Sequence, residues 1–341
     1  METCTCRWCG FSDSRAELGA DANEDGFWCP DCDGYTCFDE NRDKRRMLLL
    51  LESKGEGGIL QPAAKTRLRK RLSPLRYPGG KSKVIDQICG KLDGSRLNTF
   101  VELFAGGASL GLSLLEAGKI NKLILNDADV AVSTFWKQVL KSPYTDIVQT
   151  LESTPEPTLE DFRKARDVVQ DFRENVRNGW NPEYNNLGFS YLLLNRLSFG
   201  GIGETPICGW SGTNEELRQR WNPAELIKRI HIIRAMEDRI EVTNKDAIKF
   251  FTDVAGWLPQ DSTVFVDPPY TVAGQRLYKE TFAGKHEELA TVLNCFFCSW
   301  PGPDIVLTYD ECELIRSLYP YAEISCLQTS WSIGRKGIKT A

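Results

Sequence analysis

The fold is most clearly indicated by the stretch Val264-Phe265-Val266-Asp267-Pro268-Pro269-Tyr270. Its first three residues are apolar and mostly β-branched, which is typical of a strand buried in a parallel sheet. The strand must end at the two prolines, because proline has no amide donor and its φ is fixed at about −65°. Asp267 is therefore predicted at the carboxyl end of a strand, where open α/β sheets bind their ligands.

The turn after this strand suits a flat heterocycle that carries an amino group. The amine can donate hydrogen bonds to the Asp267 carboxylate and to the Pro268 carbonyl. Pro269 stiffens the backbone at this point, and Tyr270 offers an aromatic face on which the ring can stack. The alternative is a strand that ends in an ordinary Pro-Pro turn, and the segments described next favour the binding site.

A nucleotide-binding unit is predicted earlier in the chain. Residues 98–104 are expected to form a strand, followed by the turn Ala105-Gly106-Gly107-Ala108-Ser109 and an apolar helix. The spacing differs from the dinucleotide fingerprint, so neither NAD nor ATP is specifically indicated. A second strand, 122–126, ends at Asp127, which can accept hydrogen bonds from ribose hydroxyls. The pattern predicts a cofactor with an adenosine half and no essential pyrophosphate, against the alternative of an ordinary tight turn.

Two loops carry candidate binding residues. The loop 74–81 is rigid, contains glycine and ends in Lys81 at the start of a helix predicted for 82–89, which suits a carboxylate or a phosphate. Residues 145–235 are predicted as a mostly helical insertion. It contains a glycine loop that can enter a DNA groove or fill the gap left by an extruded base, and that carries Asn195, Arg196, Ser198 and Phe199. Internal packing of this helix and loop is the alternative.

The rest of the catalytic region completes an α/β pattern. Strands are predicted at 239–243, 304–308 and 322–328, and helices at 129–142 and 286–300. Asp246 follows the first of these strands and is expected either to contact an adenine ring or to cap the next helix.

The segment before residue 73 is predicted to be separate from the catalytic domain. Residues 42–54 are expected to form a short leucine-rich helix, and Gly55-Glu56-Gly57-Gly58 is typical of a linker. A basic run without any acid follows at 65–83. The predicted organisation is a module over 1–40, a helix and basic linker over 41–72, and a catalytic domain over 73–341 with 145–235 as its insertion.

The first forty residues indicate a zinc ribbon. Two C-x2-C pairs, Cys6 with Cys9 and Cys29 with Cys32, have the spacing of tetrahedral Zn²⁺ ligands. Cys4 and Cys37 lie close enough to replace one of the four, and unligated thiols are the alternative. A module this small cannot bury enough core by itself, so zinc is expected to stabilise its fold. Its acidic composition favours a structural role or the docking of a protein partner.

Charge and hydropathy narrow the class of protein. The 341 residues have a net charge of −5, which argues against an indiscriminate polyanion binder. No run approaches the roughly 20 apolar residues of a membrane span, and the start of the chain lacks the pattern of a signal peptide. We therefore expect a cytoplasmic protein without a membrane partner.

Three motifs together resemble the Dam-type (D12 class) DNA adenine methyltransferases, which use S-adenosylmethionine. They are Tyr77-Pro78-Gly79-Gly80-Lys81, Phe104-Ala105-Gly106-Gly107 and Asp267-Pro268-Pro269-Tyr270, and they occur in this order. The resemblance begins at about residue 73 and implies a Rossmann-like methyltransferase fold. It also implies that the cofactor is contacted by Tyr77, Lys81, Phe104, Gly106, Gly107, Asp127 and Asp267, with Asp246 as a further candidate.

The same resemblance implies how double-stranded DNA is bound. The insertion corresponds to the target-recognition region, residues 195–202 to its DNA-reading loop, and Arg76 to a basic DNA contact. Members of the family that read GATC carry Asn and Arg where this loop has Gly200 and Glu204. Because Glu cannot hold guanine in the bidentate way that Arg does, GATC is not the predicted site.

The expected reaction is direct methyl transfer to the N6 amino group of an adenine flipped out of the duplex. The chain has no Pro-Cys dipeptide, the usual setting of the nucleophile in cytosine-C5 enzymes. Three alternatives stay open at this point: methylation of cytosine N4, methylation of an RNA base, and a catalytically silent DNA-binding adaptor.

Overall fold

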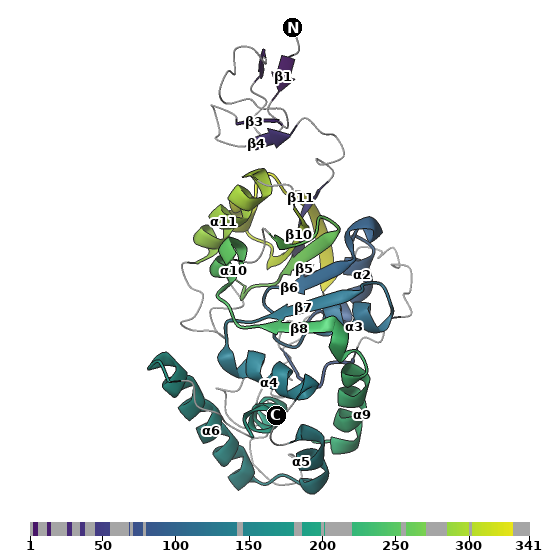
Figure 1. The fold of residues 1–341 in the computed structure, drawn as a ribbon, viewed down its shortest axis with the longest axis vertical. Helices are drawn as coiled ribbons and strands as arrows, with labels where there is room; N and C mark the ends of the chain where they lie inside the picture. The colour runs from purple at the N-terminus through teal and green to yellow at the C-terminus, as the bar shows by residue number, and fades with distance from the viewer. Residues whose placement is uncertain are drawn as a thin grey trace, which may run out of the picture.

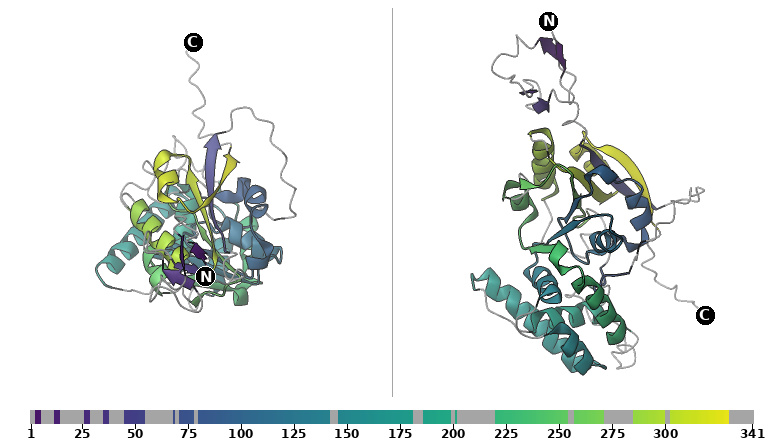
Figure 2. Two further views of the ribbon diagram at one scale, coloured as in Figure 1. Left: turned by 90° about the horizontal axis from the view of Figure 1, so that it is seen from above. Right: turned by 45° about the vertical axis from the view of Figure 1, so that its right-hand side comes forward.

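The computed structural model describes residues 3–5, 12–14, 26–28, 35–37, 45–54, 68, 71–77, 80–141, 146–180, 186–198, 201, 220–253, 257–270, 285–299 and 302–329. A seven-stranded sheet lies at the centre, with helices on both of its faces and a helical lobe at one end (Figures 1 and 2). The predicted α/β fold with a parallel sheet is confirmed. No helix in these ranges is both long enough and apolar enough to cross a membrane.

The order in which the chain adds strands to the central sheet reverses once. Its strands are β5 (Met47–Lys54), β6 (Thr99–Glu102), β7 (Lys122–Asn126), β8 (Ile240–Thr243), β9 (Ser262–Val266), β10 (Asp304–Asp310) and β11 (Glu323–Thr329). They lie in the order β11-β5-β10-β9-β6-β7-β8, and each neighbouring pair is parallel. The chain runs outward from β6 to β8 and then returns to β9 on the other side of β6. The carboxyl ends of β6 and β9 therefore flank a topological switch point.

Strand β5 corrects one prediction. Residues 47–54 were expected to lie in a short helix, but they form a strand between β10 and β11. Leucine has a high helix propensity, and a short apolar run does not distinguish a helix from a buried strand. Leu48 and Leu50 face one core whereas Met47, Leu49 and Leu51 face the other, so tertiary burial on two sides outweighs the propensity. Part of the predicted helix and linker thus belongs to the sheet.

Helices cover both faces of the sheet. One face packs against α2 (Ile85–Cys89), α3 (Ser109–Glu116) and α4 (Val130–Leu140), and the other against α10 (Ala247–Asp253), α11 (His286–Ser299) and α12 (Glu313–Leu318). The strand side chains alternate between these two layers, with Phe265 on the first side and Val264 and Val266 on the second. Short 3-10 turns lie at Lys81–Lys83, Gly94–Arg96 and Glu237–Arg239.

The insertion is helical in its described part, as predicted. It contains α5 (Ile147–Ser153), α6 (Leu159–Arg177), α7 (Leu187–Leu197) and α9 (Pro223–Arg234). Figures 1 and 2 show α5, α6 and α9 in a lobe beyond β8. Helix α7 packs between α6 and α4, and Arg173 of α6 forms an ion pair with Asp129 at the start of α4. The lobe is therefore fastened to the loop that follows β7.

Two small strand pairs lie near the N-terminus. β1 (Thr3–Thr5) pairs with β2 (Ser12–Ser14), and β3 (Gly26–Trp28) pairs with β4 (Tyr35–Cys37), both antiparallel. The predicted zinc ligands, Cys6, Cys9, Cys29 and Cys32, fall outside the described residues.

Candidate active site

Asp267 lies directly after β9, at the switch point. Its Oδ1 accepts a hydrogen bond from Thr308 Oγ1 at 2.6 Å, and its Oδ2 lies 2.6 Å from Lys81 Nζ. Thr308 belongs to β10, which runs parallel to β9, so two adjacent strands bring the hydroxyl and the carboxylate together. The Asp267 side chain is 21% exposed. The carboxylate is thus both oriented by its neighbours and accessible from outside.

Lys81 connects three parts of the site. Its side chain is only 4% exposed, and Nζ lies between the carboxylates of Asp267 and Glu52, the second at 3.3 Å. The same ammonium lies 5.0 Å from the ring centroid of Tyr270, a cation–π contact. A buried ammonium is tolerated because these partners compensate for its lost hydration. The loop that precedes Lys81 is therefore fixed to the ends of β5 and β9.

Glu52 is a site residue that the sequence analysis missed. Its side chain is 4% exposed, and Oε1 accepts a hydrogen bond from the Tyr270 hydroxyl at 2.6 Å. The Tyr270 ring also stacks on Tyr309, with centroids 6.3 Å apart. Burial, together with the charges of Asp267 and Glu52, raises the pKa of Tyr270 well above its usual value, so the hydroxyl stays a donor.

A sequence signal for Glu52 does exist. It ends an apolar run, Met47 to Leu51, in the same way that Asp267 ends the run Val264 to Val266. Once residues 47–54 are recognised as a strand parallel to β10, this pattern places a carboxylate at the same edge of the sheet.

Glu102 is a second buried carboxyl that the sequence analysis did not single out. It ends β6, and its Oε1 accepts a hydrogen bond from the backbone N–H of Gly111 in α3. Burial raises the pKa of Glu102 to about 8. The hydrogen bond from Gly111 lowers this pKa, and the charge of Asp267 raises it. Glu102 is therefore mostly protonated at neutral pH. A Cβ on Gly111 would lie 2.5 Å from Leu123 Cδ1 and 2.8 Å from Glu102 Oε1, so a larger residue would require these two side chains to move.

The glycine turn after β6 brings several predicted cofactor residues together. Gly106 has φ of +43°, and a Cβ there would lie 3.0 Å from Tyr77 Cε1, so the Tyr77 ring lies against the turn. The Asp127 carboxylate accepts hydrogen bonds from the backbone N–H groups of Gly106 and Asp129, both at 2.9 Å. Burial raises the pKa of Asp127 to about 7, with the charge of Asp129 as the next cause. Each Asp127 oxygen can still accept a further hydrogen bond.

The remaining predicted cofactor residues lie around this turn or beside it. Gly107 lies close to Tyr77, and Phe104 packs partly buried against the second core. Asp246 caps α10, because its Oδ1 accepts a hydrogen bond from Ile248 N at 3.0 Å, while its Oδ2 lies 3.4 Å from Lys285 Nζ. The capping alternative therefore describes Asp246 in this structure.

Two residues predicted to contact DNA are buried instead. The Asn195 side chain accepts a hydrogen bond from Arg76 N at 2.8 Å and donates to Arg76 O at 2.9 Å and Gly201 O at 2.7 Å. Both amide hydrogens of Asn195 are thus used within the protein, and the residue is 1% exposed. Ser198 is also fully buried. Arg76 is exposed, and Phe199 falls outside the described residues.

A carboxylate at the switch point of a parallel sheet, beside a glycine turn and an aromatic side chain, is typical of α/β enzymes that bind ligands at the carboxyl ends of their strands. The chain belongs to the family described as D12 class N6 adenine-specific DNA methyltransferase, which matches residues 77–331. Strand β5, with Glu52, precedes the matched residues.

Two relatives are similar over shorter stretches. Modification methylase StsI of Streptococcus sanguinis is 36% identical over 80 residues, which is 24% of this chain and 12% of the relative. Type II methyltransferase M.FokI of Planomicrobium okeanokoites is 25% identical over 204 residues, which is 59% of this chain and 29% of the relative. The matched stretches thus cover less than a third of either relative.

Proposed function

We propose that this protein transfers a methyl group from S-adenosylmethionine to the N6 amino group of adenine in duplex DNA. The observation that carries the proposal is the Asp267 carboxylate at the switch point, oriented by Thr308 and by Lys81, whose ammonium also lies over the ring of Tyr270. Membership of an adenine-specific family and the names of the two relatives support the same reaction.

The residues around the glycine turn fit this cofactor. Asp127 retains acceptor capacity for ribose hydroxyls, whereas the ammonium of Lys81 is buried between Asp267 and Glu52. Tyr77 and the side-chain-free Gly106 and Gly107 would line the space beside them. When bound, S-adenosylmethionine supplies a methyl group activated by the positive charge on sulfur.

The amino group of the target is positioned by Asp267 and its neighbours. In duplex DNA this group is paired, so the adenine has to leave the stack before it can reach the site. The Asp267 carboxylate and the Pro268 carbonyl then accept its two hydrogens, and the ring stacks on Tyr270. Held in this way, the nitrogen directs its lone pair at the methyl group. As the new N–C bond forms and the bond between the methyl group and sulfur breaks, Asp267 would stabilise the positive charge on nitrogen and accept the surplus proton.

Product analysis tests this function. The protein is incubated with methyl-labelled S-adenosylmethionine and duplex DNA of mixed sequence, and the DNA is digested to nucleosides. We expect the label in N6-methyl-deoxyadenosine. Label in N4-methyl-deoxycytidine, or in RNA but not in DNA, would identify one of the two enzymatic alternatives and overturn the proposal.

We further propose that the N-terminal module holds one structural Zn²⁺ through Cys6, Cys9, Cys29 and Cys32. Each C-x2-C pair lies, in sequence, between the two strands of an antiparallel pair, as two zinc-binding knuckles require.

Elemental analysis of the purified chain is therefore expected to find about one zinc per molecule, and Cys29→Ser should remove it. Cys326→Ser is the matched control, because Cys326 is an exposed free thiol on β11 and should leave the zinc content unchanged. Full zinc content in Cys29→Ser would contradict this ligand set.

A further inference from the structure

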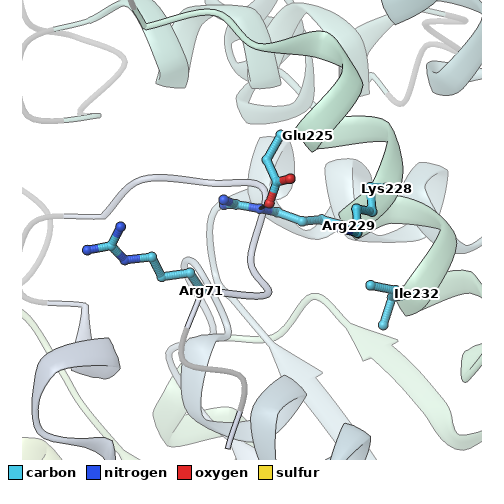
Figure 3. A pocket seen from close by; sticks show the side chains of 5 residues that line it. All are labelled: Arg71, Glu225, Lys228, Arg229 and Ile232. Atoms are coloured by element: carbon cyan, nitrogen blue, oxygen red, sulfur yellow. Dashed lines mark hydrogen bonds and ion pairs between the residues drawn. The ribbon is translucent and has the colours of Figure 1, made fainter.

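A basic pocket lies between α9 and the segment that leads to the cofactor loop. It has a volume of about 400 Å³ and is lined by Arg71, Glu225, Lys228, Arg229 and Ile232 (Figure 3). Figure 3 shows Arg71 on the chain segment opposite the helix, whereas the other four side chains come from α9. Three cations and one acid line the pocket, so its net charge is positive and it suits an anion.

Hydrogen bonds of Arg229 and the packing of α9 hold the wall of the pocket in place. Arg229 Nη1 donates a hydrogen bond to the backbone oxygen of Ser73 at 3.1 Å, and Arg229 Nε pairs with Glu225 Oε1 at 3.1 Å. The guanidinium therefore bridges the helix and the opposite segment. On the buried side of α9, Leu226, Ile230 and Ile233 pack into the first core. A ligand would meet cations whose supporting backbone is already in place, which reduces the entropic cost of binding.

Arg229, which lines the pocket, also interacts electrostatically with a buried arginine, Arg196. Burial lowers the pKa of Arg196 to about 10, and the charges of Arg76, Arg229 and Arg220 lower it further in that order. The Arg196 guanidinium donates one hydrogen bond, to Arg220 O at 3.0 Å, while its Nε is buried without a partner among the described residues. Like charges repel one another, and an anion bound at Arg229 would weaken the repulsion between Arg229 and Arg196. Arginine clusters of this kind match the geometry of phosphate.

The pocket is physically connected to the active site. Ser73, which Arg229 holds, lies against the glycine turn, because a Cβ on Gly107 would be 3.5 Å from Ser73 Oγ. Arg76 directly precedes Tyr77, and Asn195 bonds both the N–H and the carbonyl of Arg76. An anion bound in the pocket is therefore tied through a short, hydrogen-bonded segment to the loop that carries Lys81.

We propose that Arg71, Lys228 and Arg229 bind a backbone phosphate of duplex DNA, at a site distinct from the base-reading loop. This inference rests on the proposed function, because DNA as the polyanion follows from it. Contacts to phosphate carry no sequence information but fix the register of a protein on the duplex. The site thus supplies affinity that is independent of sequence and holds the duplex beside the loop of residues 73–77.

The test compares the full chain with the double variant Arg71→Gln/Lys228→Gln. Binding of fluorescent DNA duplexes of unrelated sequences is measured by anisotropy over a series of salt concentrations. We expect the Kd at about 0.1 M salt to rise roughly tenfold for every duplex, and the slope of log K against log salt to become shallower by about one, because one phosphate contact is lost. Lys249→Gln, a change at an exposed lysine on α10, is the matched control and should leave both quantities unchanged.

Inorganic phosphate and duplex RNA are two further probes. They show whether the pocket binds free phosphate, RNA or the backbone of DNA. Inorganic phosphate should compete with DNA more strongly than chloride of equal ionic strength, and this difference should disappear in the double variant. Unchanged DNA binding in the double variant would overturn the proposal, even if phosphate alone bound to the pocket. A double variant that loses affinity for duplex RNA of the same sequence but not for DNA would also overturn the proposal.

Failure of the proposed function gives a different result. In that case the wild-type chain incorporates no methyl label into DNA, while its DNA binding still depends on Arg71 and Lys228. Normal methyl transfer with DNA binding that is indifferent to both residues would instead overturn the phosphate site and leave the proposed function intact.

Discussion

Replacing Asp267 by Asn is expected to slow methyl transfer about a thousandfold, the scale on which loss of one directly stabilising group acts in an active site. Asparagine has the same shape and can still accept the hydrogen bond from Thr308. It has no charge, however, and its NH₂ group would face either Lys81 or the amino group of the target, so a donor would face a donor. The rate is measured in single turnovers with saturating DNA and labelled cofactor.

The matched control for this change is Asp261→Asn. Asp261 immediately precedes the amino end of β9, so it lies at the opposite edge of the sheet from Asp267. Both variants should retain cooperative thermal unfolding, and only Asp267→Asn should lose activity. A rate close to wild type in Asp267→Asn would remove this carboxylate from the chemistry.

Changing Glu52 to Gln should lower kcat about tenfold to a hundredfold, which corresponds to roughly 1.4 to 2.7 kcal/mol. Glutamine can still accept the hydrogen bond from Tyr270, but it has no negative charge and so loses the ion pair with Lys81. Lys81 then pairs with Asp267 alone and neutralises the carboxylate that the reaction needs. Glu52→Ala should have the larger effect, because it also leaves the buried Tyr270 hydroxyl without this acceptor. Steady-state kcat and KM for both substrates are the measurements.

A purely structural role for Glu52 predicts a different pattern. Loss of folded protein would lower the melting temperature and the active fraction together, whereas a positioning role lowers kcat per folded molecule. Glu323→Gln is the matched control. It breaks an exposed ion pair with Arg46 at the amino ends of the strands, whereas Glu52 lies toward their carboxyl ends. If Glu52→Gln matched this control in kcat, Glu52 would have no part in the reaction.

The elements that could be predicted are those whose signal is local. Residues 122–126 form β7 within the predicted bounds, and the strand before Asp267 ends where its prolines require. The glycine turn, Tyr77 and Asp127 meet as expected, because consecutive βα units of a parallel sheet bring their loops to one edge.

The features that could not be predicted depend on partners far away in sequence. The run Met47–Leu51 is apolar enough for either a helix or a strand, and only its two neighbouring strands make it β5. Asparagine is a residue type that often contacts DNA, but the side chain of Asn195 is hydrogen-bonded to the backbone of Arg76, 119 positions earlier in the sequence. Thr308 meets Asp267 only because β10 and β9 are adjacent.

The position of β5 between β10 and β11 has a consequence for biogenesis. Arg46, at the start of this strand, reaches Glu323 at the start of β11 across 277 positions of sequence. During synthesis from the ribosome, β5 emerges before β6 to β9 and stays unpaired until its two neighbours, β10 and β11, have been made. Such distant closures are slow and leave an apolar segment exposed to wrong partners, so this half of the sheet is the part of the nascent chain most in need of a chaperone.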